Sequence, residues 1–206
     1  MTAATVNDPH CVLASSVSAL GKRLGGLVAA ETIGRSWFEY GLENVRRQAA
    51  LAGEPLDQVD ADVRVHETCA HHLYVEHESA EAVARLDSQC ADMIRSYAGV
   101  PCTFMQQIGD ISLAKQWKQV DAPVLVIYGT SDPATSADEG RYLAGLINSF
   151  HPGRANYVEI SGMGHDFQRY ASQTEFLNRR KDPKPHPYDD ETVDVVINWL
   201  EQQLQS

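Results

Sequence analysis

Two polar residues follow short apolar segments, at positions where side chains often carry chemistry. Asp132 stands in a Gly-Thr-Ser-Asp turn after the apolar segment 124–128, and His165 stands in a Gly-Met-Gly-His turn after the segment 155–160. A carboxylate beside a histidine can hold one tautomer of the imidazole and stabilise its protonated form. If the two turns meet, this pair could orient and supply a general base that activates a nucleophile.

The pattern around these turns predicts a parallel sheet that brings them together. A third apolar run, 27–33, is typical of a buried parallel strand. A helix is expected at 136–149, between the two segments named above. Strands that alternate with helices indicate a parallel sheet with right-handed crossovers. The carboxyl ends of its strands share one edge, where ligands bind, so we expect Asp132 and His165 to lie there.

The long stretch between the first and second of these strands has a helical pattern. It covers about residues 34–119, which is too long for a simple crossover, so we interpret it as a helical insertion. A further short helix is expected at 12–23, and an amphipathic one at 190–204. Within the insertion the pattern predicts helices over 34–53, 60–78, 79–98 and 109–118.

The segments with Asp132 and His165 resemble the C-terminal part of α/β-hydrolases. APVLVIYGTSDPATS resembles the strand and loop that bring the acid in that family, and YVEISGMGHDF resembles the segment that brings the histidine. The last helix resembles the one that packs back onto the sheet, and the helical insertion lies where the family carries its cap. Glu31, at the end of the first strand, is a second candidate acid, but Asp132 is preferred because its loop matches.

The resemblance implies an α/β fold: the C-terminal part of an α/β-hydrolase, with about three parallel strands and a helical cap insertion. The partial core would consist of residues 1–33 and 120–206, and the cap of residues 34–119. It also implies hydrolysis of a small-molecule ester or a peptide amide through an acyl-enzyme. Asp132 would orient His165, which would take the proton of the nucleophile.

The nucleophile motif of that family is missing from the sequence. No serine stands in a G-x-S-x-G pattern, which the strained turn of a nucleophile elbow requires. PHCVLA can be laid over the family's GHSxGG with Cys11 in the place of the serine, but Pro9 and Leu13 replace the glycines. We therefore expect Cys11 to be an ordinary cysteine and the chain to be a truncated hydrolase that is inactive alone.

Truncation would leave the strand at 27–33 with an unpaired edge. Such an edge can pair with another chain, so a complementing N-terminal half or a second copy of the chain is an expected partner. The alternative function is a non-catalytic binding or interaction domain that keeps the histidine loop as inherited structure.

Composition excludes several other classes of function. The formal net charge of −11 argues against binding to nucleic acid or to an anionic membrane surface. No apolar stretch approaches the roughly 18 residues of a spanning helix, and no signal peptide is visible. The four cysteines form no CxxC pair, so we expect reduced thiols and a cytoplasmic location.

No cofactor and no metal are expected. HETCAHHLYVEH lacks the HExxH pattern, because Ala70 stands where the second histidine is required. Cys69, His72 and Glu76 share a helix face and could in principle bind zinc. We interpret them as a solvated face with an incidental cysteine.

Overall fold

The computed structural model describes residues 3–6, 24–181 and 183–205. The chain divides into two compact units. The first contains the chain up to Arg35 together with the chain from Leu113 onward, and the second contains residues 36–112. The second unit is therefore inserted at a single place in the first.

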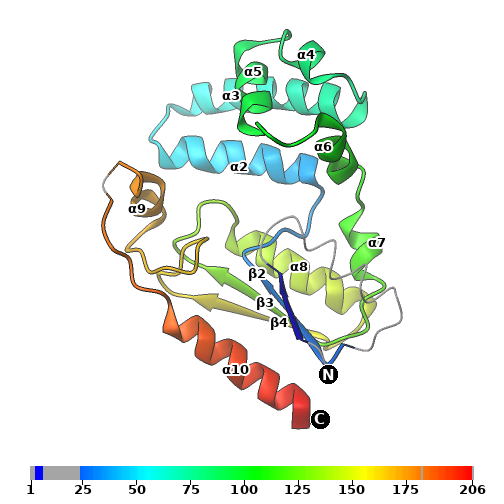
Figure 1. The fold of residues 1–206 in the computed structure, drawn as a ribbon, viewed down its shortest axis with the longest axis vertical. Helices are drawn as coiled ribbons and strands as arrows, with labels where there is room; N and C mark the ends of the chain where they lie inside the picture. Colours follow the sequence, from blue (N-terminus) through cyan, green and yellow to red (C-terminus); the bar gives the residue numbers. More distant parts are fainter. Residues whose placement is uncertain (1–2, 7–23, 182, 206) are drawn as a thin grey trace. The chain divides into compact units, whose positions relative to one another are not determined.

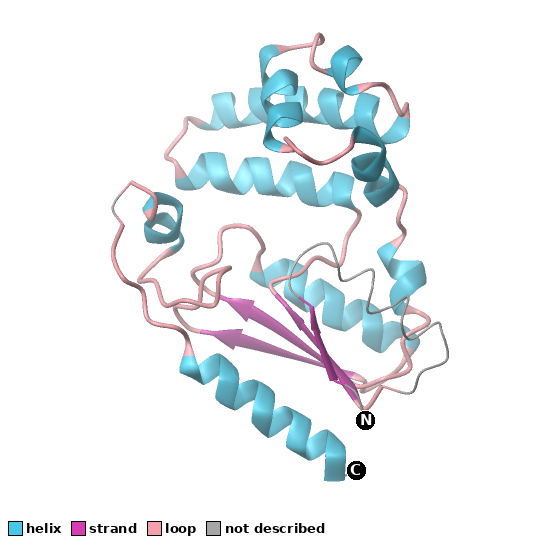
Figure 2. Cartoon of the chain, in the orientation of Figure 1, coloured by secondary structure: helices cyan, strands magenta, loops and turns pink. Residues whose placement is uncertain are grey.

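The first unit is built on a parallel sheet of four strands in the order β1-β2-β3-β4 (Figures 1 and 2). The strands are β1 (Ala3–Val6), β2 (Gly26–Ala30), β3 (Val124–Gly129) and β4 (Ala155–Ile160). In the register of the sheet, Leu27 pairs with Val124, and Val124 pairs with Ala155. This confirms the predicted α/β class, with the predicted strands adjacent and parallel.

The prediction that the strand at 27–33 has an unpaired edge is wrong. The segment β1 pairs with β2 in parallel, from Ala3 opposite Gly26 to Val6 opposite Ala29. All five residues of β2 are buried, so their backbone groups need partners on both sides. Among the described residues, the edge strands are β1 and β4. The strand β2 also ends earlier than predicted, at Ala30, because Glu31 has a left-handed backbone with φ of 49°.

Helices cover both faces of this sheet. Figure 1 shows α8 (Ala137–Phe150) on one side and α10 (Asp190–Gln205) on the other. On the α10 side the apolar core consists of alternate strand residues and residues of the loop and helix that follow: Val28, Ala30, Leu125, Ile127, Ile160, Met163 and Trp199. The contact with α10 is close, since a Cβ on Gly26 would lie 2.8 Å from the ring of Trp199. The unit also contains α7 (Leu113–Trp117) and α9 (Gln173–Asn178).

The second unit is entirely helical among the described residues. It comprises α2 (Trp37–Leu51), α3 (Leu56–Ala70), a π-helical turn η1 (His71–Val75), α4 (Ala80–Val83), α5 (Ser88–Ser96) and α6 (Cys102–Gly109). The single helix predicted over 79–98 is wrong, because Asp87 starts a new helix by accepting a hydrogen bond from the Gln89 N–H at 2.8 Å. Ser79 is the N-cap of α4, where its side chain accepts a hydrogen bond from the Ala82 N–H. The helix α6 was not expected.

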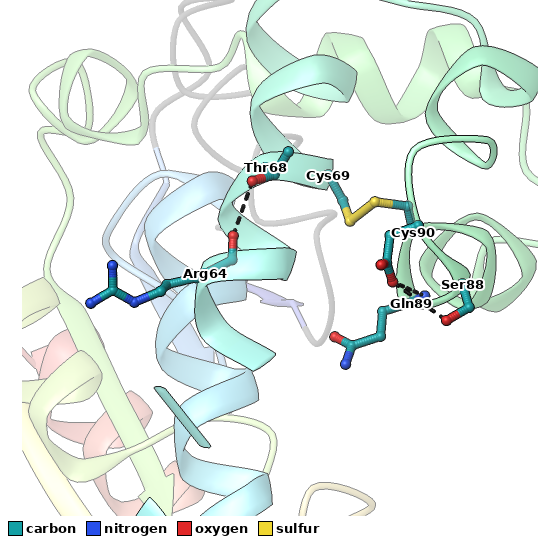
Figure 3. The surroundings of a disulfide bond; sticks show 7 residues. Arg64, Thr68, Cys69, Ser88, Gln89 and Cys90 are labelled. Atoms are coloured by element: carbon teal, nitrogen blue, oxygen red, sulfur yellow. Dashed lines mark hydrogen bonds between the residues drawn. A yellow bond between two sulfur atoms is a disulfide. The ribbon is translucent and has the colours of Figure 1, made fainter. Parts of the chain in front are cut away.

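A disulfide joins Cys69 of α3 to Cys90 of α5 inside the second unit (Figure 3). Both cysteines belong to the buried core of this unit, and their Cα atoms are 5.3 Å apart. The prediction of reduced thiols is therefore wrong for this pair. A spacing of 21 residues carries no sequence signature, because the pairing depends on how two helices pack. Disulfides are rare in cytosolic proteins, so this bond does not support the predicted cytoplasmic location. That location stays a prediction.

Two sequence predictions concern residues near the N-terminus that the structure does not describe. The candidate Cys11 and the helix expected at 12–23 lie outside the described residues. Within the described part of the chain, no helix is both long enough and apolar enough to span a membrane.

Candidate active site

The loop after β3 holds Asp132 by hydrogen bonds to its own backbone. The Asp132 N–H donates to the Gly129 carbonyl at 3.0 Å, which closes the turn. Its Oδ1 accepts from the Ala134 N–H at 2.7 Å. Its Oδ2 accepts from the Thr135 N–H at 3.3 Å and from the Thr135 hydroxyl at 2.7 Å. An aspartate that bonds the backbone two and three residues onward is a common turn former, and here it is completely buried.

The loop after β4 needs both of its glycines, for different reasons. Gly162 has a left-handed backbone with φ of 78°, which side chains rarely adopt. Gly164 lacks room for a side chain, because a Cβ there would lie 2.7 Å from the rings of Phe176 and Tyr170. Met163 between them is completely buried. The Gly-Met-Gly segment is thus a tight turn anchored by one apolar side chain, and His165 follows directly.

The two loops are joined by hydrogen bonds near their bases. The Gly162 N–H donates to the Thr130 hydroxyl at 2.9 Å, and the Ser131 N–H donates to the Met163 carbonyl at 3.0 Å. The Ser131 hydroxyl also donates to the Tyr170 carbonyl at 2.9 Å. These contacts fix one loop against the other independently of the contact between the acid and the histidine.

The structure brings Asp132 and His165 together. His165 Nδ1 lies 3.0 Å from Asp132 Oδ2. Burial raises the pKa of Asp132, but hydrogen bonds from His165 and Glu31 and the attraction of the imidazolium outweigh it and hold the pKa below its usual range. An ionised carboxylate only accepts hydrogen bonds, so the Nδ1 of His165 carries the proton. The His165 side chain is 37 % exposed, while that of Asp132 is 0 % exposed.

Glu31 is the third titratable group at this place. It is 2 % exposed, and its Oε1 accepts from the Gly129 N–H. Burial, followed by a hydrogen bond to Asp132 and repulsion from it, raises the pKa of Glu31 well above its ordinary value. Glu31 was the second candidate acid, and the structure places both acids together. The acid within hydrogen-bonding distance of His165 Nδ1 is Asp132.

Two residues that position this site, Thr135 and Glu139, were not predicted from the sequence. The Thr135 hydroxyl lies 2.7 Å from Asp132 Oδ2 and 3.0 Å from Glu31 Oε2, so it links the two acids. Glu139 of α8 is buried, accepts from the Gly34 N–H at 2.9 Å and pairs with the Arg35 guanidinium, which anchors the segment after Glu31. A local sequence signal exists for Thr135, which stands three residues after an Asp. None exists for Glu139, because its contacts depend on packing between distant segments.

Metal binding is a weaker interpretation of the same three groups. Glu31, Asp132 and His165 bring ligand atoms within 4.8 Å of one another. All four carboxyl oxygens, however, already have hydrogen-bond partners within the protein. The zinc alternative in the second unit loses one of its three ligands, since the Cys69 sulfur is in a disulfide.

Comparisons with known proteins add only a resemblance in fold. No family model matches the sequence, and no curated protein matches it. Among solved structures, the chain is similar to a protein of Mycobacterium tuberculosis H37Rv described as the non-heme bromoperoxidase BpoC. The two are 14% identical, with a TM-score of 0.47, over 100% of this chain and 68% of that one. We draw no conclusion on activity from this likeness.

Proposed function

We propose that this chain carries the acid and the base of a hydrolase that cleaves an ester or amide through an acyl-enzyme. The observation that supports this is the Asp132–His165 pair, with a buried ionised carboxylate on Nδ1 of a partly exposed imidazole. Both residues follow neighbouring strands at their carboxyl ends, where α/β folds bind ligands.

The geometry supports a separate role for each of the two residues. Asp132 holds the imidazole with its proton on Nδ1, which leaves the Nε2 lone pair as the base. His165 would take the proton of a nucleophile and then give it to the leaving alcohol or amine. The increasing positive charge on the imidazole would be stabilised by Asp132. The second unit, residues 36–112, would correspond to the cap that selects the substrate in hydrolases of this kind.

The nucleophile and the oxyanion hole are not identified among the described residues. The strand β1 makes Cys11 a better candidate for the nucleophile, because a nucleophile elbow follows a strand. The strand β1 ends at Val6, five residues before Cys11 in the sequence. Cys11 is therefore the first residue to substitute if the chain proves active. Among the described residues β1 has a neighbour on one side only, and a second copy or a complementing chain would pair on the other side.

The missing G-x-S-x-G pattern supports a second candidate function. In that case the chain is a non-catalytic binding domain in which Asp132 and His165 remain as structural residues. The two candidates differ in whether His165 is needed for any turnover.

The deciding experiment is hydrolysis of a short-chain aryl ester by the purified chain. We expect His165→Ala to reduce kcat/KM at least ~100-fold, the lower end for loss of a general base. His151→Ala is the matched control, because His151 is a partly exposed histidine of the same unit whose side chain is bound only to a backbone carbonyl in the described contacts. Equal activity in all three proteins, or none in the wild type, would exclude the hydrolase proposal for this chain alone.

A further inference from the structure

Glu31 occupies an unusual place for a glutamate. It lies at the carboxyl end of β2 with a left-handed backbone, φ 49°, and a side chain that is 2 % exposed. Non-glycine residues seldom adopt this backbone, and acidic residues are seldom fully buried. Such an outlier beside a candidate active site indicates that the side chain is kept for what it contacts.

The hydrogen bonds around Glu31 show where its proton must be. The Thr135 hydroxyl has a single proton and lies 2.7 Å from Asp132 Oδ2 but 3.0 Å from Glu31 Oε2. Asp132 therefore receives that proton. Glu31 then has one evident donor, the Gly129 N–H on Oε1. Its Oε2 faces the Thr135 oxygen, and its carboxyl group is within hydrogen-bonding reach of Asp132. These contacts are favourable only if Glu31 supplies a proton itself.

The donors to Asp132 lead to the same distribution of charge. Its carboxylate accepts from two backbone N–H groups, from the Thr135 hydroxyl and from His165 Nδ1. Two carboxyl groups this close cannot both be ionised without a large repulsion. The group with more donors keeps the charge, so Asp132 is ionised and Glu31 is neutral. The raised pKa of Glu31 and the lowered pKa of Asp132 agree with this assignment.

We propose that Glu31 is a positioning residue whose neutral carboxyl donates a hydrogen bond to the Asp132 carboxylate and so tunes His165 as a base. This rests on the proposed function for its catalytic meaning. A buried carboxylate with no such donor would hold a proton more firmly on the imidazole and leave less free base near neutral pH. Glu31 draws part of the negative charge of Asp132 toward itself and fixes the direction of that carboxylate.

The two possible charge states of Glu31 predict different responses of the His165 pKa to Glu31→Gln. A glutamine amide reproduces the hydrogen bonds of a neutral glutamic acid, with its oxygen on the Gly129 N–H and its nitrogen toward Asp132. If Glu31 is neutral, the pKa of His165 should therefore change by less than about 0.3 units. If Glu31 is ionised, the substitution removes a negative charge within 4.8 Å and should lower the pKa of His165 by about one unit or more.

The test is an NMR titration of the His165 imidazole in the full chain, with the resonance assigned by its loss in His165→Ala. We expect Glu31→Gln to titrate like the wild type and Glu31→Leu, which cannot donate, to raise the pKa of His165 by about one unit. His151 serves as an internal reference that should not move. A lowered His165 pKa in Glu31→Gln, or an unchanged one in folded Glu31→Leu, would overturn the proposal. If Glu31→Leu does not fold, the Glu31→Gln result decides alone.

This measurement needs no turnover, so it separates the two proposals. An inactive wild type with the expected titration would exclude hydrolysis by this chain alone but keep the coupling of Glu31 to His165. An active wild type whose variants show the overturning titration would keep hydrolysis as the proposed function but exclude the proposed role of Glu31. In an active protein, the acid limb of the kcat/KM profile should also move with Glu31→Leu, which a merely structural role would not produce.

Discussion

The disulfide between Cys69 and Cys90 should control the stability of the second unit. It closes a loop over a sequence separation of 21 residues. By the loop-entropy relation, a crosslink of this size stabilises the folded state by about 3 kcal/mol. Since every 1.4 kcal/mol is tenfold, reduction should increase the population of the unfolded second unit by roughly 150-fold. The helices α3 and α5 should be affected first, because the bond joins them directly.

Hydrogen exchange followed by mass spectrometry can measure this in the full chain, with and without a thiol reductant. We expect amide protection in residues 36–112 to fall by about two orders of magnitude on reduction, while protection in β2, β3 and β4 stays unchanged. The double variant Cys69→Ala/Cys90→Ala should behave like the reduced wild type. The control is Cys102→Ala, since Cys102 is a free thiol of the same unit. A loss of protection below about threefold, or an equal loss in both units, would show that the loop-entropy reasoning is wrong.

Two further predictions concern the site. Gly129→Ala should destabilise the protein by about 3 kcal/mol or more, because its Cβ would lie 2.2 Å from the Met163 carbonyl oxygen and 2.6 Å from Glu31 Oε1. Gly145→Ala, in a helix with open space around it, is the matched control and should stabilise by about 0.5 to 1 kcal/mol in thermal denaturation. Because the pKa of Glu31 is raised in the folded protein, its contribution to stability is complete below about pH 4.3 and is lost as the pH rises through its folded pKa. The pKa of Asp132 is lowered, so its contribution is lost in the other direction, as the pH falls below about 3.9. Urea unfolding from pH 4.5 to 7.5 should thus show a decline of up to about 1.4 kcal/mol per pH unit that is absent in Glu31→Gln, and equal slopes in the two proteins would contradict the assignment of the proton.

The parts of the fold that could be predicted from the sequence are those with local causes. The strands β3 and β4 are short apolar runs that end in glycine turns, and the polar residues in those turns lie at the sheet edge because parallel strands align their carboxyl ends. The meeting of Asp132 and His165 followed from these two facts. The short strand β1 did not, because four residues contain too little pattern and its strand character depends on pairing with β2.

The parts that could not be predicted depend on contacts between distant residues. The hydrogen bond from the Gly129 N–H to Glu31 spans 98 residues of sequence, and the contact between Thr135 and Glu31 spans 104. No periodicity indicates such a contact, so Glu31 could be placed at a strand end from the sequence, but its partners could not be predicted. The same reason hides the disulfide, which requires that α3 and α5 pack with Cys69 and Cys90 facing each other.

The insertion of one unit between β2 and β3 has a consequence for how the chain folds during synthesis. Leu27 pairs with Val124, so a ribosome adding 5–20 residues per second needs roughly 5 to 20 s between making one partner and making the other. Through that interval β2 lacks a neighbour on its inner side, while residues 36–112 are contiguous and have a core and a crosslink of their own. The order of events is therefore set by the topology: the inserted helices can form first, and the edge that bears Asp132 and His165 is assembled last, when β3 and β4 leave the ribosome.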